Sequence, residues 1–353
     1  MSACVRCPAQ SIFVALAAAA MLHGANAQEA PAPAAPQRQA AQPDAAAHQR
    51  GVIDWLRRMH EASRRVSYIG TFVVSAGGND WSSARIWHAC DAGGTTQVER
   101  VEALTGAPRT TFRRGEQVLT FLPERRIVRS EKRIDLDQFP SLSKPDEAIA
   151  TYYDAKVVGE ARVAGFDTDV VQLVPRDALR FGYRMWVERG SGLLTKLQTL
   201  DAAGRTVEQS AFSELELDAP VKVQALSQMM AKTDGYHLEA VDVERIDAAA
   251  EGWTLKQPVP GFREMHCFRR AANGQGARTV QWIFSDGLAS VSLFVEPDDA
   301  NSHRREGLLA LGATYTLTRR LSGGGQDWWL TAVGEVPPQT LERFATSLER
   351  VPR

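Results

Sequence analysis

The chain has 353 residues with 41 basic and 42 acidic side chains, so its formal net charge is only −1. That balance argues against bulk electrostatic binding of nucleic acid, although local basic patches remain compatible with it. The length is sufficient for two domains that each bury a core of their own.

The N-terminus has the organisation of a cleaved secretory signal, residues 1–27. Its apolar run, Ile12–Leu22, is far shorter than the roughly 20 residues that a membrane-spanning helix needs. Ala25-Asn26-Ala27 then matches the small-x-small pattern that signal peptidase accepts. The alternative, a buried N-terminal helix, lacks an amphipathic pattern. Cys4 and Cys7 precede the apolar run, so their C-x-x-C spacing would be lost with the signal.

Residues 28–50 are rich in Ala, Pro and Gln without a periodic apolar face, which predicts a disordered leader. The pattern changes at Val52. Apolar residues then recur at helical spacing and predict an amphipathic helix to about Ser63. Its apolar face comprises Val52, Trp55, Leu56, Met59 and Ala62.

Residues 66–217 are predicted to form about 11 short strands, because runs of period-2 character alternate with Gly-, Pro- and Asp-containing turns. A loop with a short helix interrupts them between Ile134 and Asp154. Tight turns favour one large antiparallel sheet, which must curl or partly close to protect its edges. We therefore predict a large domain over residues 51–220, followed by a polar, Ala-rich linker over 221–250.

A second, smaller unit is predicted over residues 251–353. It contains strands at 263–270, 278–286 and 289–296, a loop at 298–306, and a strand pair around the Ser322–Gln326 turn. In Gly334–Thr340, "GEVPPQT", glycine should close the last of these strands and Pro338 or Gln339 should open a final helix. The fold class is α+β, mainly β, in both units.

Catalytic and metal-binding motifs are not evident, so we predict that the protein is not an enzyme and has no cofactor or metal. His266 and Cys267 are neighbours in a strand and should point to opposite faces. Cys90 and Cys267 could form a disulfide in an oxidising compartment, but two free thiols are favoured because the cysteines belong to different predicted domains.

Several predicted strands carry apolar residues on both faces, which means that both faces are covered or that one lines a cavity. An acyl chain would suit such a cavity in a secreted protein. Arginines flanking these strands could bind lipid phosphates, or they could protect edge strands by their charge. The candidate lipid-binding residues are Phe72, Ile86, Leu119, Phe121, Met185, Trp186, Arg113 and Arg114.

An ordered series of short stretches resembles the MucB/RseB family, periplasmic negative regulators of an envelope-stress sigma factor. They include "YIGTF" at Tyr68, the long run from Ala150 to Asp177, "VPGF" at Val259, "FSDGL" at Phe284 and "GEVPPQT" at Gly334. Other matching stretches lie at 106–115, 183–209 and 289–296. The resemblance covers nearly all of residues 52–351.

The resemblance implies a curved, lipoprotein-carrier-like half-barrel with covering helices, followed by a smaller partner-binding domain. It also implies a periplasmic protein that binds an inner-membrane anti-sigma factor of the MucA/RseA type and shields it from site-1 proteolysis. Lipid or lipopolysaccharide fragments would release that grip, and a homo-oligomer is possible. As aromatic anchors for the partner we select Phe294, Trp328 and Trp329. The alternative function is a periplasmic lipid or lipoprotein carrier.

Overall fold

The structure is a computed structural model that describes residues 51–77, 81–132, 139–141, 145–240, 243–271, 278–298 and 304–351. The predicted signal peptide and leader, with Cys4 and Cys7, lie outside the described residues. Among the residues that are described, no helix has the length and apolar character needed to cross a membrane.

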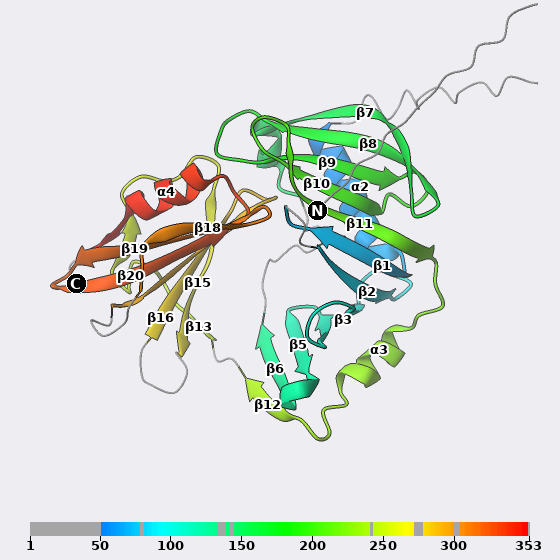
Figure 1. Ribbon diagram of the computed structural model, residues 1–353, viewed down its shortest axis with the longest axis horizontal. Helices are drawn as coiled ribbons and strands as arrows, with labels where there is room; N and C mark the ends of the chain where they lie inside the picture. Colours follow the sequence, from blue (N-terminus) through cyan, green and yellow to red (C-terminus); the bar gives the residue numbers. More distant parts are fainter. Residues whose placement is uncertain are drawn as a thin grey trace, which may run out of the picture. The chain divides into compact units, whose positions relative to one another are not determined.

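The first domain is built on a 12-stranded sheet with the strand order β12-β6-β5-β4-β3-β2-β1-β11-β10-β9-β8-β7. Its pairs are antiparallel except β12 with β6, which is parallel. Figure 1 shows the sheet as a curved layer. The predicted large antiparallel sheet is thus confirmed. Its strands are β1 (Tyr68–Ser75), β2 (Trp81–Cys90), β3 (Gln97–Ala103), β4 (Thr110–Arg114), β5 (Gln117–Leu122), β6 (Ile127–Lys132), β7 (Tyr153–Val163), β8 (Phe166–Pro175), β9 (Gly182–Glu188), β10 (Leu194–Leu200), β11 (Thr206–Leu217) and β12 (His237–Ala240).

Helix α2 (Val52–Arg65) covers one face of this sheet at strands β7 to β11, alongside which it is drawn in Figure 1. Asp54 in its first turn and Arg64 and Arg65 in its last turn suit the helix dipole. All five predicted apolar positions of the helix are buried. Leu56 and others pack against Val171, Leu173, Met185 and Val187 of the sheet. We call this covered face the inner face.

The opposite, outer face is partly covered by helix α3 (Val223–Met230). Met230 packs against Phe112, Leu119, Phe121 and Val128, which point outward from β4 to β6. Short 3-10 helices lie at η1 (Pro123–Arg125) and η2 (Glu147–Thr151), the second within the predicted helical interruption. Helices therefore cover part of each face, which explains much of the two-sided apolarity of the strands.

The second domain is built on a seven-stranded sheet with the order β13-β15-β16-β17-β20-β19-β18, and all its pairs are antiparallel. A smaller sheet pairs β14 with β21. Strand β18 was not predicted, because its sequence, Gly-Leu-Leu-Ala-Leu, has no period-2 alternation. The strands are β13 (Val243–Arg245), β14 (Trp253–Leu255), β15 (Arg263–Ala271), β16 (Arg278–Ser285), β17 (Ser290–Pro297), β18 (Gly307–Leu311), β19 (Thr314–Gly323), β20 (Gln326–Gly334) and β21 (Leu348–Arg350).

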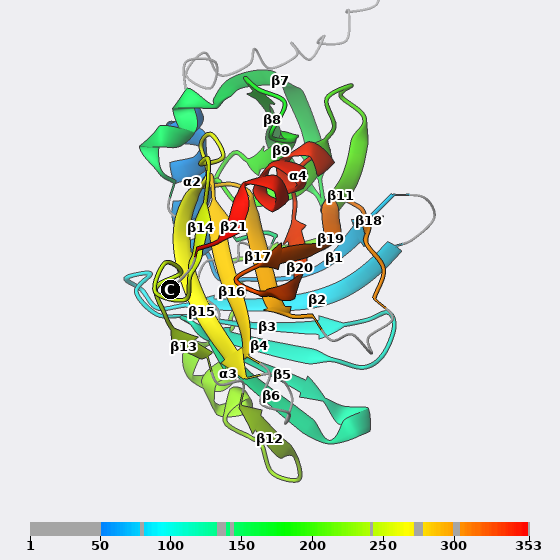
Figure 2. The same ribbon diagram turned by 90° about the vertical axis from the view of Figure 1, so that its left-hand side faces the viewer.

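Helix α4 (Pro338–Ser347) packs across one face of this second sheet, as Figure 2 shows. Gly334 ends β20 and Pro338 opens the helix, as predicted. Leu341 and Phe344 of α4 are fully buried in the core of the domain. Helix α4 ends at Ser347, because the chain turns into β21 at Leu348.

The two remaining cysteines are free thiols. Cys267 lies in the core of the second domain, where burial above all, together with the charges of nearby carboxylates, raises the pKa of its thiol to about 12. His266 points to the opposite face and contacts the ring of Phe268. No cluster of metal-ligating side chains occurs within the described residues.

Candidate functional site

A cavity of ≈ 220 Å³ opens on the inner face of the large sheet. Phe72 of β1 and Met185 of β9 both line it, although 113 positions separate them in the chain. The cavity wall combines apolar side chains with a few polar groups, as is usual for sites that hold an apolar ligand. Its lining residues are Phe72, Val74, Phe139, Ser141, Tyr183, Met185, Leu194, Leu197, Thr199, Glu208, Ser210, Leu288 and Glu335.

Strand register explains why these side chains meet. Phe72 pairs with Phe212 across β1 and β11, and Leu197 pairs with Met185 across β10 and β9. Because side chains of directly paired residues lie on one face of a sheet, each pair adds to the same surface. The ring of Phe139 packs against those of Phe72 and Phe212, at centroid distances of 5.8 and 5.3 Å.

The cavity is lined by both domains. Leu288, in the turn between β16 and β17, and Glu335, just after β20, come from the second domain. Leu288 also packs against the buried cluster under α2. A ligand in this cavity would therefore contact both domains at once.

A second, more polar cavity of ≈ 350 Å³ lies on the inner face of β2 to β6. Arg113, a predicted phosphate ligand, lines it, whereas Arg114 is exposed on the other side of β4. Three arginines and two glutamates give the cavity a mixed but net positive lining, which suits a phosphate-bearing ligand. The charged lining residues are Glu99, Arg109, Arg113, Arg129 and Glu131.

Glu99 of the polar cavity has several hydrogen-bond and charge partners. Its Oε1 lies 3.1 Å from Nδ1 of the buried His88 and accepts a hydrogen bond of 2.9 Å from Ser141 Oγ. Burial alone would raise the pKa of Glu99, but the hydrogen bond and charge of His88, the charge of Arg113 and the Ser141 hydroxyl together lower it to about 2. Because Ser141 donates to Glu99 and not to His88, these residues do not form an activated nucleophile.

Three other predicted lipid-binding residues lie on the outer face. Leu119 and Phe121 pack in the cluster under α3, and Trp186 is half-buried with Lys196 Nζ 4.5 Å from its ring centroid. Successive residues of a strand point to opposite faces, so Trp186 and its neighbour Met185 cannot share a cavity. Ile86 is buried on the inner face beside Phe72 but does not line either cavity.

The predicted partner-binding aromatics occupy both faces of the second sheet. Trp328 faces the core, with its ring centroid 5.1 Å from that of Trp253. Trp329 points the other way and is buried, with the guanidinium of Arg304 5.8 Å from its ring centroid. Phe294, on the same side as Trp329, is half-buried. Their role in partner binding stays a prediction.

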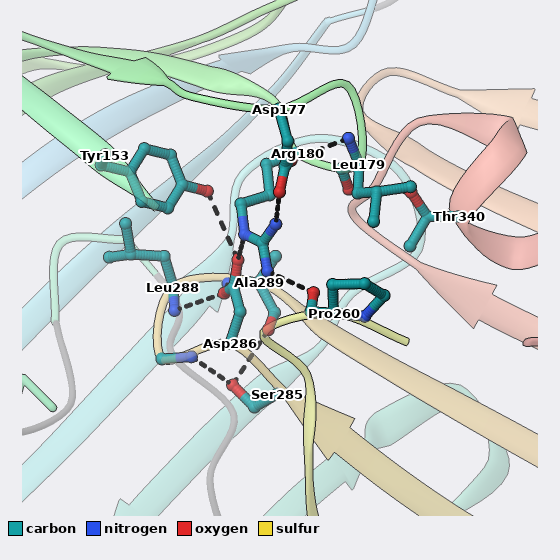
Figure 3. Close-up of polar contacts among 11 residues, drawn as sticks. Tyr153, Asp177, Leu179, Arg180, Pro260, Ser285, Asp286, Leu288, Ala289 and Thr340 are labelled. Atoms are coloured by element: carbon teal, nitrogen blue, oxygen red, sulfur yellow. Dashed lines mark hydrogen bonds and ion pairs between the residues drawn. The ribbon is translucent and has the colours of Figure 1, made fainter. Parts of the chain in front are cut away.

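The sequence did not reveal the joint between the two domains, which is drawn in Figure 3. Arg180, in the loop between β8 and β9, and Asp286, in the turn after β16, form an ion pair of 2.8 Å with both side chains fully buried. Arg180 also donates to Pro260 O at 2.8 Å and pairs with Asp177. Its guanidinium stacks on the ring of Tyr152, 4.2 Å from the centroid.

Both carboxylate oxygens of Asp286 also accept hydrogen bonds. Its Oδ1 accepts the backbone N–H groups of Leu288 and Ala289, at 2.9 and 2.8 Å, which closes the turn. Its Oδ2 accepts from Arg180 and, at 3.5 Å, from the hydroxyl of Tyr153. Burying a pair of charges is tolerable only when its geometry is good and its remaining polar groups are bonded, and both conditions hold here.

Further contacts surround this ion pair. Leu179 of the first domain inserts into the core of the second, and Thr340 Oγ1 donates to its carbonyl at 2.8 Å. Gly261 has φ +80°, and a Cβ there would lie 1.9 Å from Arg180 Nη2. Only glycine fits such a close approach without rearrangement.

The stretches that resemble a known family converge on this joint. Tyr153 and Asp177 lie in the run from Ala150 to Asp177, Gly261 in "VPGF", Asp286 in "FSDGL" and Thr340 in "GEVPPQT". The signal was therefore present in the sequence as a series of dispersed motifs. What they share, a contact between two domains, is visible only in three dimensions.

The N-terminal domain model of the MucB/RseB family matches residues 51–230, and its C-terminal domain model matches residues 247–349. The chain belongs to the MucB/RseB family. One relative, the sigma factor AlgU regulatory protein MucB of Pseudomonas aeruginosa, is 31% identical over 305 residues, which is 84% of this chain and 90% of the relative. Another, the sigma-E factor regulatory protein RseB of Escherichia coli K12, is 28% identical over 83% of this chain and 89% of its own length.

Solved structures of MucB/RseB proteins have the same fold. The complex of P. aeruginosa MucA and MucB matches with a TM-score of 0.67 and 28% identity, covering 85% of this chain and 99% of that one. A second structure, of MucB in complex with MucA(peri), gives a TM-score of 0.65 at 28% identity with the same coverage.

Proposed function

We propose that this chain is a periplasmic regulatory protein that binds the periplasmic region of a membrane-anchored anti-sigma factor. By shielding that region from site-1 proteolysis, it restrains an envelope-stress response, and lipid or lipopolysaccharide fragments release it. Support for the partner comes from MucB, a family member whose structure is known in complex with MucA and with MucA(peri). The predicted signal peptide supports a periplasmic location.

The observation that carries the lipid part is the apolar cavity to which both domains contribute. A ligand can shift a protein between two states only if it binds them unequally. Leu288 lines the cavity and belongs to the same short turn as Asp286, whose carboxylate holds Arg180. An acyl chain that displaces Leu288 would therefore disturb the turn that joins the domains, and so favour a different domain arrangement.

The polar cavity supplies a second element of recognition. Three arginines line it: Arg109 in the turn before β4, Arg113 on β4 and Arg129 on β6. Guanidinium groups pair well with phosphate oxygens. Phosphorylated, acylated lipids combine both chemistries, so they are the class of ligand that suits these two cavities together.

The test measures the affinity of the full chain for the periplasmic region of P. aeruginosa MucA, with and without an acylated, phosphorylated lipopolysaccharide fragment. Wild-type protein should bind the MucA region and protect it from the site-1 protease, and the fragment should weaken both effects. If the fragment demonstrably binds while the affinity for MucA is unchanged, the lipid switch is wrong.

A matched pair of variants locates the effect. Leu197→Glu places a charge in the apolar wall of the cavity and should abolish the response to lipid while leaving MucA binding intact. Val158→Glu, at an exposed position on β7, should respond as the wild type does. Equal lipid responses in the two variants would place the lipid elsewhere.

The cavity alone also favours a second function, that of a lipid or lipoprotein carrier. A carrier would bind and hand over its cargo without a protein partner. The two functions separate in the same assay, because a carrier would bind the lipid fragment but not the MucA region. The complete second domain, with its own core, favours the regulator.

A further inference from the structure

Strand β18 forms an open edge of the second sheet. Among the strands of the described residues it pairs with β19 alone, and it ends the strand order. All five of its residues, Gly307 to Leu311, are exposed. Leu309 and Leu311 have exposed fractions of 70% and 63%, and Leu308 47%, so three leucines stand in solvent on one short strand.

The other edges of the two larger sheets carry charges. Edge strand β7 carries four charged residues, Asp154, Lys156, Glu160 and Arg162, and its pairing with β8 has an irregularity after Val157. Edge strand β12 carries Glu239, and edge strand β13 carries Glu244 and Arg245. Charges, bulges and short length are devices that keep an edge strand from pairing with another chain. Strand β18 is short but has no charged residue and no bulge, so it remains suited to pairing.

The surroundings of β18 are basic. Arg304 and Arg305 lie just before it, with Glu306 between them and the strand, and Arg319 and Arg320 lie on the neighbouring β19. Arg304 pairs with Glu296 and Arg320 with Asp298. Glu306 offsets one of the two remaining arginines, Arg305 and Arg319, so the surplus here is one positive charge. An incoming segment would thus be favoured if it had apolar side chains for the leucines and acidic residues beside them.

The end of β18 reaches the rim of the apolar cavity. The turn that follows it contains Gly312, which has φ +60°. A Cβ added at this position would lie 2.4 Å from Glu208 Oε2, so the turn packs closely against Glu208. The next residue, Ala313, donates its backbone N–H to the same oxygen at 3.0 Å. Glu208 itself lines the cavity. A segment bound along β18 would therefore end beside the proposed lipid site.

We propose that β18 binds an extended segment of the anti-sigma factor's periplasmic region, apolar with acidic flanks, as an added strand of the second sheet. The inference rests on the proposed function and specifies how the partner is held. Backbone hydrogen bonds to the open edge would supply affinity. Leu309 and Leu311 on one face, and Leu308 on the other, would select the side chains of the segment.

The test compares Leu309→Lys with the wild-type full chain in binding the periplasmic region of P. aeruginosa MucA. A lysine on the edge should weaken binding by about tenfold or more, because it places a charge where an apolar strand must pair. Since Leu309 is 70% exposed, the variant should fold normally, which circular dichroism checks. The control, Leu238→Lys, makes the same change at a 55% exposed leucine on edge strand β12 and should bind as the wild type does.

Hydrogen exchange reports directly on the backbone. Binding of the MucA region should slow amide exchange within Gly307–Leu311, because amides that point away from β19 would gain partners. If the wild type binds MucA but β18 gains no protection and Leu309→Lys binds equally well, strand addition is wrong and the proposed function stands. Failure of the wild type to bind MucA at all would overturn both.

A second copy of this chain is the rival occupant of the edge. Sedimentation of the wild type and Leu309→Lys without MucA decides this point. A wild-type dimer that the substitution converts to a monomer, with unchanged affinity for MucA, would assign β18 to self-association and overturn the proposal.

Discussion

The two halves of the large sheet use the same inner face in different ways. Under α2, strands β7 to β11 present a packed apolar surface that includes Val171, Leu173 and Met185. Strands β2 to β6 present the same face as a polar cavity with charged side chains. The half under α2 thus stabilises the domain and also lines much of the apolar cavity, whereas the other half contains the polar cavity.

The second domain follows the same division. Polar contacts of the second domain with the first involve Asp146 beside η2, the loop between β8 and β9, strand β7 and strand β11, which belong to the packed half. The lesson is that domain joining and packing share one half of the sheet.

Replacement of Asp286 by alanine should have the largest effect. It leaves the guanidinium of Arg180 buried without its fully buried counter-charge, which should lower the free energy of unfolding by about 3–5 kcal/mol. Urea unfolding measures this. The matched control is Asp154→Ala, which removes an ion pair whose two side chains are half-exposed and should cost no more than about 1 kcal/mol. Equal losses would show that the buried pair is not special.

Leu56→Ala should cause the next largest loss of stability. Leu56 is fully buried under α2, so its truncation should cost about 2–5 kcal/mol through lost burial and a residual cavity. Leu122→Ala removes the same atoms from the lining of the polar cavity, where the side chain is only half-buried, and should cost about 1 kcal/mol. Thermal or urea unfolding of both variants compares the packed half of the sheet with the half that contains the polar cavity. Equal losses of stability would show that the two halves do not differ in packing.

Glu99→Gln tests the polar half through pH. The pKa of Glu99 is about 2 in the folded protein, below its ordinary value of 4.5. Ionised Glu99 therefore stabilises the folded state at pH values above 4.5, and this contribution is lost as the pH falls toward 2. It amounts to at most about 3 kcal/mol. The difference in unfolding free energy between wild type and variant should therefore shrink between about pH 6 and about pH 2. A difference that does not change with pH would mean that the Glu99 carboxylate contributes no such linkage.

Much of the architecture was predictable from local patterns. The helical spacing of Val52 to Ala62, the period-2 runs of the first sheet and the opening of α4 at Pro338 all appear in the structure. Such patterns are readable because each element buries one side and repeats with its own period. Strand β18 was missed because an exposed edge strand of leucines buries neither side.

The candidate site was predictable only in part. Phe72, Met185 and Arg113 line cavities, but Leu119, Phe121 and Trp186 point outward. Sequence shows that neighbouring residues face opposite ways. It does not show which of the two faces is covered by α2, because that depends on the curvature of the sheet and on where the helix packs.

By itself, the sequence determined the two-domain, mainly β organisation and, through dispersed motifs, the family. Only the tertiary structure showed that those motifs meet at the contact between the two domains. Arg180 and Asp286 are 106 positions apart, and in the sequence each looks like an ordinary surface charge. The physical reason is that a charge is tolerated in the interior only when its partner is brought to it. Folding of both domains supplies that partner, and no local pattern records it.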